Sequence, residues 1–147
     1  MSSSSLPLDG QAAIVTGSSR NVGRAIALAL AADGAAIVVN AMNDDEGATA
    51  VVAEIEAAGG KAIKHMADVT DEAAVDGLAQ AAIDAFGGLQ ILVNNAAIRR
   101  QQSIESMSLD EWRAVIAVIL DAAFLCARAS LPHMVAAGGG AIVNIGG

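Results

Sequence analysis

The chain has 147 residues, of which 54% are hydrophobic and only 2% aromatic, and its formal net charge is −8. This length suits one domain with a buried core built from Ala, Val, Ile and Leu. The acidic balance argues against nucleic acid or an anionic membrane as a partner, and we expect no segment of membrane-spanning length. The single cysteine, Cys126, cannot form an internal disulfide, which fits a reducing, cytoplasmic location.

Short apolar segments alternate with helical patterns along the chain. The first strand is expected at 12–15, and Val22, Ile26 and Leu30 then recur at helical spacing. Further strands are expected at 36–40, 62–67, 89–93 and 141–145, and further helices at 44–58, 71–86 and 108–137. This alternation predicts an α/β fold, a three-layer, doubly wound parallel sheet of the Rossmann type with five strands.

We expect one structural domain. Residues 1–7 form a serine-rich stretch without a basic or apolar signal region, which predicts a flexible leader. Residues 8–147 carry the strand–helix alternation without a linker or an internal repeat. The predicted sheet domain therefore extends from residue 8 to residue 147.

A glycine-containing loop follows the first strand and opens the first helix. A helix amino terminus presents free N–H groups and a partial positive charge, so a pyrophosphate can bind there. The candidate residues are Gly17, Ser18, Ser19, Arg20, Asn21, Val22 and Gly23. The alternative is a strand-to-helix turn that needs glycines for its geometry alone.

Three motifs together carry a family resemblance. Thr16-Gly17 with Gly23 follows the first strand, Asp68-Val69 follows the third, and Asn94-Asn95-Ala96-Ala97 follows the fourth. This pattern resembles the short-chain dehydrogenase/reductase family from about Leu8 to Gly147. The resemblance implies an NAD(P)-binding Rossmann domain that is incomplete here, because the family's remaining strands and helices have no counterpart in this sequence.

The resemblance also implies roles for individual residues in holding a nicotinamide dinucleotide. Asp68 would bond the adenine amino group and Val69 would pack on the ring, whereas Asp68 could alternatively serve only as a turn carboxylate. Asn95 and Ala96 would pass the ribose, and Ile98 would lie near the nicotinamide. Two positions depart from the family's glycines, Asn21 in the loop and Ala97 after the fourth strand. Asparagine tolerates positive φ better than other non-glycine residues, so we expect altered binding at worst.

The adenosine end favours NADP over NAD. NAD-preferring relatives have an acidic residue after the second strand, where this chain has Ala41 followed by Met42. Arg20 matches the basic residue that NADP-preferring relatives direct at the extra phosphate, although it could instead be a solvated loop charge. Asp44 and Asp45 lie nearby in sequence and could oppose that phosphate.

The residues that carry the family's chemistry have no counterpart here. Relatives use Tyr and Lys for proton transfer, a Ser to orient the substrate oxygen and an Asn to hold a water. This sequence has no tyrosine, Ile119 occupies the Asn position and Gly147 the Ser position. His65 and His133 suit structural roles better, as does Cys126, which sits inside an apolar helical segment, and an arginine cannot donate a proton. We predict no metal site.

Three functional hypotheses remain open. The first is an oxidoreductase-family fragment that binds the cofactor but does not transfer hydride by itself. The second is a non-catalytic module that binds a dinucleotide or pairs with a full-length relative, with self-association through a surface such as Trp112 and Val115. The third is an enzyme completed by a separate chain that carries Tyr and Lys.

Overall fold

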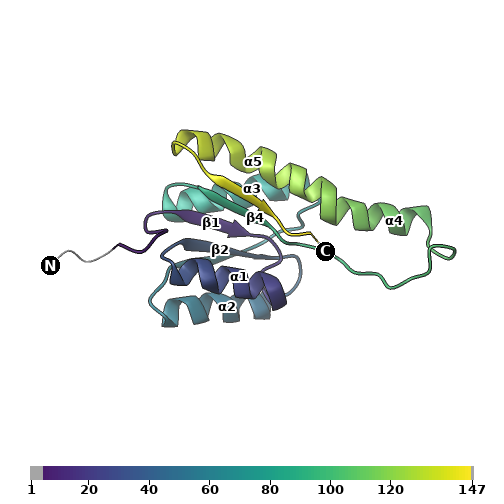
Figure 1. Ribbon diagram of the computed structural model, residues 1–147, viewed down its shortest axis with the longest axis horizontal. Helices are drawn as coiled ribbons and strands as arrows, with labels where there is room; N and C mark the ends of the chain where they lie inside the picture. Colours follow the sequence, from purple (N-terminus) through teal and green to yellow (C-terminus); the bar gives the residue numbers. More distant parts are fainter. Residues whose placement is uncertain (1–4, 147) are drawn as a thin grey trace.

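The computed structural model describes residues 5–146 and has three layers, a parallel sheet between two layers of helices (Figure 1). In chain order the elements are β1 (Ala12–Val15), α1 (Asn21–Ala32), β2 (Ala36–Ala41), α2 (Asp45–Ala57), β3 (Ala62–Met66), α3 (Glu72–Phe86), β4 (Ile91–Asn94), α4 (Leu109–Ile116), the π-helical turn η1 (Ala117–Asp121), α5 (Ala122–Ala136) and β5 (Ala141–Asn144). The five strands lie in the order β3-β2-β1-β4-β5 and all pairs are parallel. The predicted doubly wound α/β fold is therefore confirmed. The leader expected over 1–7 falls largely outside the described residues and stays a prediction.

Alternate residues of the central strands serve two separate cores. Ala13 and Val15 of β1 pack with Ile55 on the side covered by α1 and α2. Ile14 packs with Leu78 on the opposite side, which α3 and α5 cover. Because helices cover both faces, the strands are almost entirely apolar rather than alternating, as is usual for parallel sheets.

The helices differ in how their amino ends are capped. The Asp44, Asp71 and Ser108 side chains accept hydrogen bonds from the first turns of α2, α3 and α4. Ser108 and Glu111 form the capping box that the sequence predicts. Helix α1 follows Arg20 and has no side-chain cap. Its first-turn N–H groups therefore have no side-chain partner of the kind that caps the other three helices.

The long helix expected over 108–137 is interrupted. Helix α4 ends at Ile116, and the π-helical turn Ala117–Asp121 precedes α5. A π-helical turn inserts an extra residue into a helix and often occurs at functional sites. This one contains Ile119, the position that the family resemblance assigns to a water-holding asparagine.

The whole helix Leu109–Ala136 is more apolar than we expect from the sequence. It has 28 residues, a mean hydropathy of 2.0 over its most apolar window, and 17% of that window buried. By length and composition alone it could cross a membrane, so the expectation that no segment reaches this length is wrong. Helix α5 nonetheless packs on α3 and β4, and Arg128 of α5 pairs with Glu72 of α3. These are the contacts of a helix that covers a sheet.

Candidate functional site

The predicted binding residues follow the carboxyl ends of four neighbouring strands. They are Gly17, Ser18, Ser19, Arg20, Asn21, Val22 and Gly23 after β1, Met42 after β2, Asp68 and Val69 after β3, and Asn95, Ala96 and Ile98 after β4. Strand β1 lies between β2 and β4. The chain leaves β1 and β2 toward the face covered by α1 and α2, and leaves β4 toward the opposite face, which α5 covers (Figure 1). Ligands of open α/β sheets bind in the crevice at such a switch point.

Asn40 of the neighbouring strand, which is not among the predicted site residues, holds the glycine loop. Its side chain is 1% exposed, and its Oδ1 accepts from the Gly17 N–H at 3.2 Å. Its backbone N–H donates to Ser18 Oγ, and its carbonyl oxygen accepts from the Ser18 N–H. Its Nδ2 donates to the His65 and Ala67 carbonyl oxygens of the third strand region. In the sequence, the one sign of this role is that Asn40 is a polar residue at the end of an otherwise apolar strand.

Thr16 and Asn95 hold the loop from the other side. Thr16 Oγ1 accepts from the backbone N–H groups of Asn95 and Ala96, both at 3.0 Å. Asn95 Nδ2 donates to the Thr16 and Gly17 carbonyl oxygens at 3.0 and 3.1 Å. The Asn95 amide therefore positions the loop, and its ribose contact stays a prediction.

Two loop positions have demanding backbone geometry. A Cβ on Gly23 would lie 2.2 Å from the Gly17 carbonyl oxygen and 2.5 Å from Asn95 Nδ2, so only glycine fits. Asn21 has a φ of +52°, and it is the one non-glycine residue with positive φ in the described part of the chain. As the sequence predicts, asparagine stands in for glycine in the left-handed conformation.

The loop and the start of α1 fit a pyrophosphate. The first turn of α1 has no acidic residue and no side-chain cap, so its N–H groups and dipole are available to an anion. The loop beneath it is held in place by Asn40, Thr16 and Asn95. A bound phosphate group would supply the acceptors that a capping side chain supplies elsewhere.

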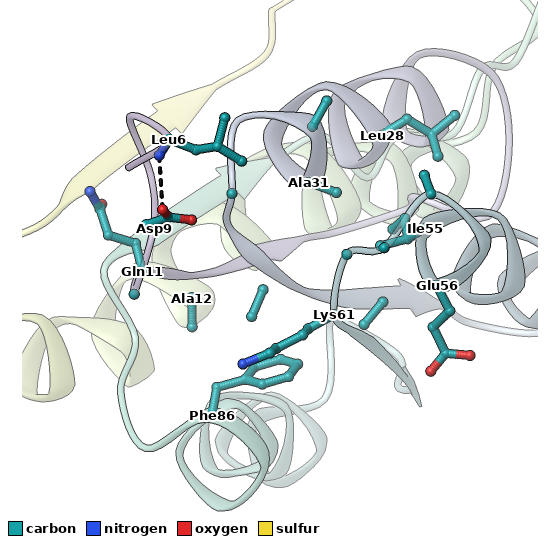
Figure 2. Close-up of a pocket in the computed structure, with 18 of the residues that line it drawn as sticks. Leu6, Asp9, Gln11, Ala12, Leu28, Ala31, Ile55, Glu56, Lys61 and Phe86 are labelled. Carbon is teal, nitrogen blue, oxygen red and sulfur yellow. Dashed lines mark hydrogen bonds between the residues drawn. The ribbon is translucent and has the colours of Figure 1, made fainter. Parts of the chain in front are cut away.

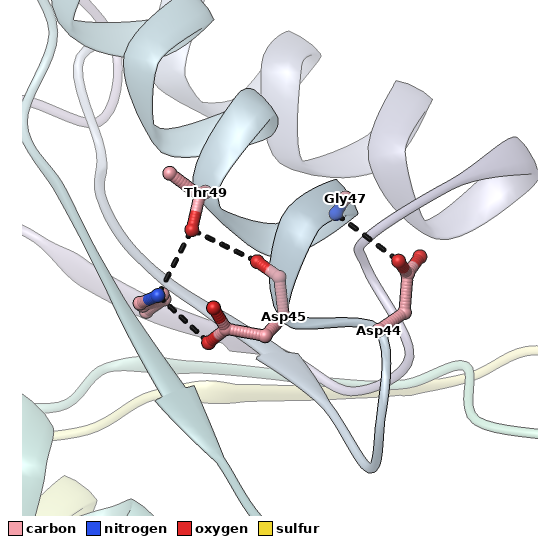
Figure 3. A network of polar contacts seen from close by, with 5 residues as sticks. Asp44, Asp45, Gly47 and Thr49 are labelled. Atoms are coloured by element: carbon pink, nitrogen blue, oxygen red, sulfur yellow. Dashed lines mark hydrogen bonds and ion pairs between the residues drawn. The ribbon is translucent and has the colours of Figure 1, made fainter.

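Two acidic residues after β2 have different partners (Figure 3). Asp44 Oδ1 accepts from the Gly47 N–H and caps α2. Asp45 Oδ1 accepts from Lys64 Nζ at 2.7 Å, and the same ammonium donates to Thr49 Oγ1 at 2.9 Å. The Asp45 charge is thereby balanced by Lys64, whereas Asp44 faces the loop.

Asp44 stays ionised beside the loop. The Ser19 hydroxyl, the Gly47 N–H and the nearby Arg20 guanidinium together lower the pKa of its carboxyl group. Arg20 is exposed and forms no ion pair by distance among the described residues. One cation, Arg20, and one anion, Asp44, therefore lie close together beside the loop.

The other predicted adenosine contacts have structural partners as well. Asp68 Oδ1 accepts from the backbone N–H and the hydroxyl of Thr70, at 2.9 and 2.7 Å. This is the turn role that the sequence left open for Asp68. Val69 is 6% exposed and belongs to the core, while Met42 is 61% exposed. Contacts of these three residues with adenine or ribose stay predictions.

A hollow of about 340 Å³ lies between the 94–99 segment, the π-helical turn and the end of β5. Ile98, Ile119 and Cys126 line it, and Asn94 Nδ2 bonds Asn144 Oδ1 at its edge. Burial raises the pKa of the Cys126 thiol to about 11, so the thiol is protonated at neutral pH. Of the residues that line the hollow, only Arg99 and Cys126 are titratable. Gly147, at the family's serine position, lies outside the described residues.

A larger hollow, of about 660 Å³, lies at the amino-terminal ends of the strands, opposite the glycine loop (Figure 2). Ala12, Ala36 and Ala62 at the starts of three strands line it, with Phe86 and Lys61 on one wall. It is therefore separated from the glycine loop by the length of the strands.

Within residues 5–146, no three His, Cys, Asp or Glu side chains are arranged to hold a metal ion.

These features define a Rossmann-type α/β domain with a glycine-containing loop at its switch point. The family model described as short chain dehydrogenase matches residues 11–147. The chain belongs to the short-chain dehydrogenase/reductase family.

Relatives with known sequences or structures agree with this assignment. The chain is 45% identical over 138 residues to a 3-oxoacyl-[acyl-carrier-protein] reductase of Synechocystis sp., covering 94% of this chain and 56% of the relative. A crystal structure of a metagenomic short-chain oxidoreductase in complex with NADP is 43% identical, with a TM-score of 0.86, covering 93% of this chain and 62% of that one. Hydroxysteroid dehydrogenase of Escherichia coli is 35% identical, with a TM-score of 0.88, covering 94% and 58%. The chain spans about half the length of the curated relatives it matches.

Proposed function

We propose that this chain binds a nicotinamide dinucleotide at the carboxyl edge of its sheet, with the pyrophosphate on the Gly17–Gly23 loop. The observation that carries the proposal is the uncapped amino end of α1 above a loop held rigidly by Asn40, Thr16 and Asn95. When bound, such a cofactor supplies or accepts hydride. The protein groups then bind and orient it.

We further propose that NADP is preferred over NAD. Ala41 ends β2 and offers no carboxylate to the ribose hydroxyls, while exposed Arg20 is suited to a phosphate dianion. The Asp44 carboxylate beside Arg20 opposes that phosphate, so it lowers the preference without reversing it. The relative crystallised with NADP is consistent with this choice.

Cofactor affinities of charge variants test the preference. Arg20→Gln is expected to weaken NADPH binding about tenfold and to leave NADH binding unchanged, because only NADPH carries the extra phosphate. Asp44→Asn should strengthen NADPH binding, since asparagine keeps an oxygen acceptor for the Gly47 N–H but removes the charge. Arg113→Gln on α4 is the matched control for net charge. Equal affinity for NADPH and NADH, with no effect of Arg20→Gln, would contradict the proposal.

The family's reaction class is hydride exchange with a carbonyl or alcohol, and we propose that these 147 residues alone do not carry it out. The sequence has no tyrosine to serve as proton donor, and apolar Ile119 faces the hollow at the position where relatives hold a water. The Cys126 thiol and the Arg99 guanidinium are both unsuited to proton transfer at neutral pH. Oxidation of bound NADPH by a carbonyl compound, faster than in buffer, would contradict this.

A second candidate is a non-catalytic module that pairs with another copy or with a full-length relative. Exposed apolar side chains on α5 favour it, with Phe124 60%, Leu131 54% and Val135 70% exposed. Strand β5 is exposed along its whole length and pairs only with β4 in the described residues. Light scattering after gel filtration distinguishes a monomer from an assembly.

We also propose a cytoplasmic location, in keeping with the buried free thiol of Cys126.

A further inference from the structure

A second, smaller hollow adjoins the one beside the π-helical turn. It measures about 300 Å³ and is lined by Arg99, Arg100, Met107, Trp112 and Val115, among others. Ile98 and Arg99 line both hollows. The two hollows therefore adjoin each other at Ile98 and Arg99.

The wall of this hollow combines two cations with apolar side chains. Arg99 and Arg100 are both exposed, and neither forms an ion pair within the described residues. Glu111 lies close enough to Arg100 for that guanidinium to help lower the pKa of the Glu111 carboxyl group, after the larger effects of the Ser108 N–H and hydroxyl that donate to it. Neither arginine is held in an ion pair, so both guanidinium groups remain available to an anion.

The charge of the rest of the molecule makes this pair distinctive. The chain has 16 acidic and 8 basic residues, and the ion pairs of the described residues use Arg24, Lys64 and Arg128. Two adjacent arginines nevertheless lie at the mouth of a hollow. Guanidinium groups bind carboxylate and phosphate through paired, charge-assisted hydrogen bonds.

We infer that the substrate is a carbonyl or alcohol compound that carries an anionic oxygen group, carboxylate or phosphate, at the end of an apolar carbon chain. Arg99 and Arg100 bind the anionic group. Met107, Trp112 and Val115 pack on the carbon chain, and the carbonyl or alcohol carbon lies toward Ile98 and Ile119. This inference rests on the proposed function, because it places that carbon beside Ile98, where the family resemblance places the nicotinamide.

Trp112 provides a direct readout, because it is the only tryptophan of the chain and lines the hollow. The experiment titrates the 147-residue chain, with and without NADP, with 4-oxopentanoate and with its neutral methyl ester, and follows Trp112 emission. We expect the carboxylate to bind about tenfold or more tightly than the ester, and less tightly as salt is raised. Monobutyl phosphate forms a further arm, and whichever anion binds more tightly identifies the preferred group.

Arginine variants tie this preference to the hollow. The double variant Arg99→Gln with Arg100→Gln should abolish the preference for the anion, and lysine at both positions should restore part of it. Arg113→Gln, which removes an exposed arginine that does not line the hollow, should keep it. Circular dichroism verifies that each variant is folded.

Equal binding of acid and ester, failure of both to change Trp112 emission, or a preference that survives the double glutamine variant would overturn the inference. NADPH fluorescence in the same samples separates the two proposals. A chain that binds NADPH but shows no preference for the anion refutes only the anionic substrate. A chain that binds the anion through Arg99 and Arg100 but not NADPH refutes only the cofactor site.

Discussion

Two helical glycines, Gly23 in α1 and Gly77 in α3, should respond to alanine in opposite directions. A Cβ on Gly77 would meet only His65 Nε2 at 3.7 Å, an ordinary contact. Alanine is favoured over glycine in a helix by about 1 kcal/mol, so Gly77→Ala should raise the free energy of unfolding by roughly that amount.

Gly23→Ala has the same propensity gain but meets backbone atoms. Its Cβ would lie 2.2 Å from the Gly17 carbonyl oxygen and 2.8 Å from Ser18 Cα, so helix α1 or the loop must move. Overpacking costs about 1–3 kcal/mol, and displacing Asn95 Nδ2 disturbs its bonds to Thr16 and Gly17, which contribute about 1 kcal/mol each. After subtraction of the propensity gain, we expect a loss of about 2–4 kcal/mol and loss of NADPH binding.

Urea unfolding followed by circular dichroism measures both variants against the wild-type chain. The comparison is matched, because each variant adds one methyl group to a helix and changes no charge. The close packing of loop and helix would be refuted if Gly23→Ala unfolded at the same urea concentration as the wild type and still bound NADPH.

The remaining predictions concern three other positions. Asn40→Ala should lower the free energy of unfolding, measured by urea unfolding, by about 2–3 kcal/mol, because it leaves the Gly17 N–H without its acceptor. A change under about 0.5 kcal/mol would show that the Asn40 side chain does not hold the loop. Asn21→Gly should raise it by about 0.5–1 kcal/mol by relieving the left-handed conformation, whereas Asn21→Ala should lower it. The Cys126 pKa rises on folding from 9.0 to about 11, so the unfolded chain loses this proton first. Stability should therefore fall between these pH values by up to about 1.4 kcal/mol per pH unit, and a Cys126→Ala chain should lack this component.

Local patterns predicted most of the fold. The strand–helix alternation, the capping box at Ser108 and the positive φ of Asn21 depend on neighbouring residues, so the sequence carries them directly. The Asn94 bond to Asn144, which ties β4 to β5, follows from the order of the parallel strands. The position of the glycine loop at the carboxyl edge follows from the same topology.

Features that depend on distant contacts were not predictable in this way. Asn40 looks like one more residue of a strand until the sheet brings Gly17, His65 and Ala67 around it. The π-helical turn at Ile119 has no proline or glycine to mark it. The low burial of the most apolar part of the helix also depends on how the helix packs on the sheet. The ion pair between Asp45 and Lys64 forms only because β3 lies beside α2 in the folded chain. Each of these arises from tertiary packing rather than from local sequence.

A fluorescence titration of NADPH with the 147-residue chain tests whether the Gly17–Gly23 loop binds the cofactor. We expect enhanced NADPH emission that saturates with micromolar affinity, is competed by NADP more effectively than by NAD, and disappears in Gly23→Ala but not in Gly77→Ala. If the folded wild-type chain leaves NADPH emission unchanged at all concentrations, the proposed cofactor site is wrong.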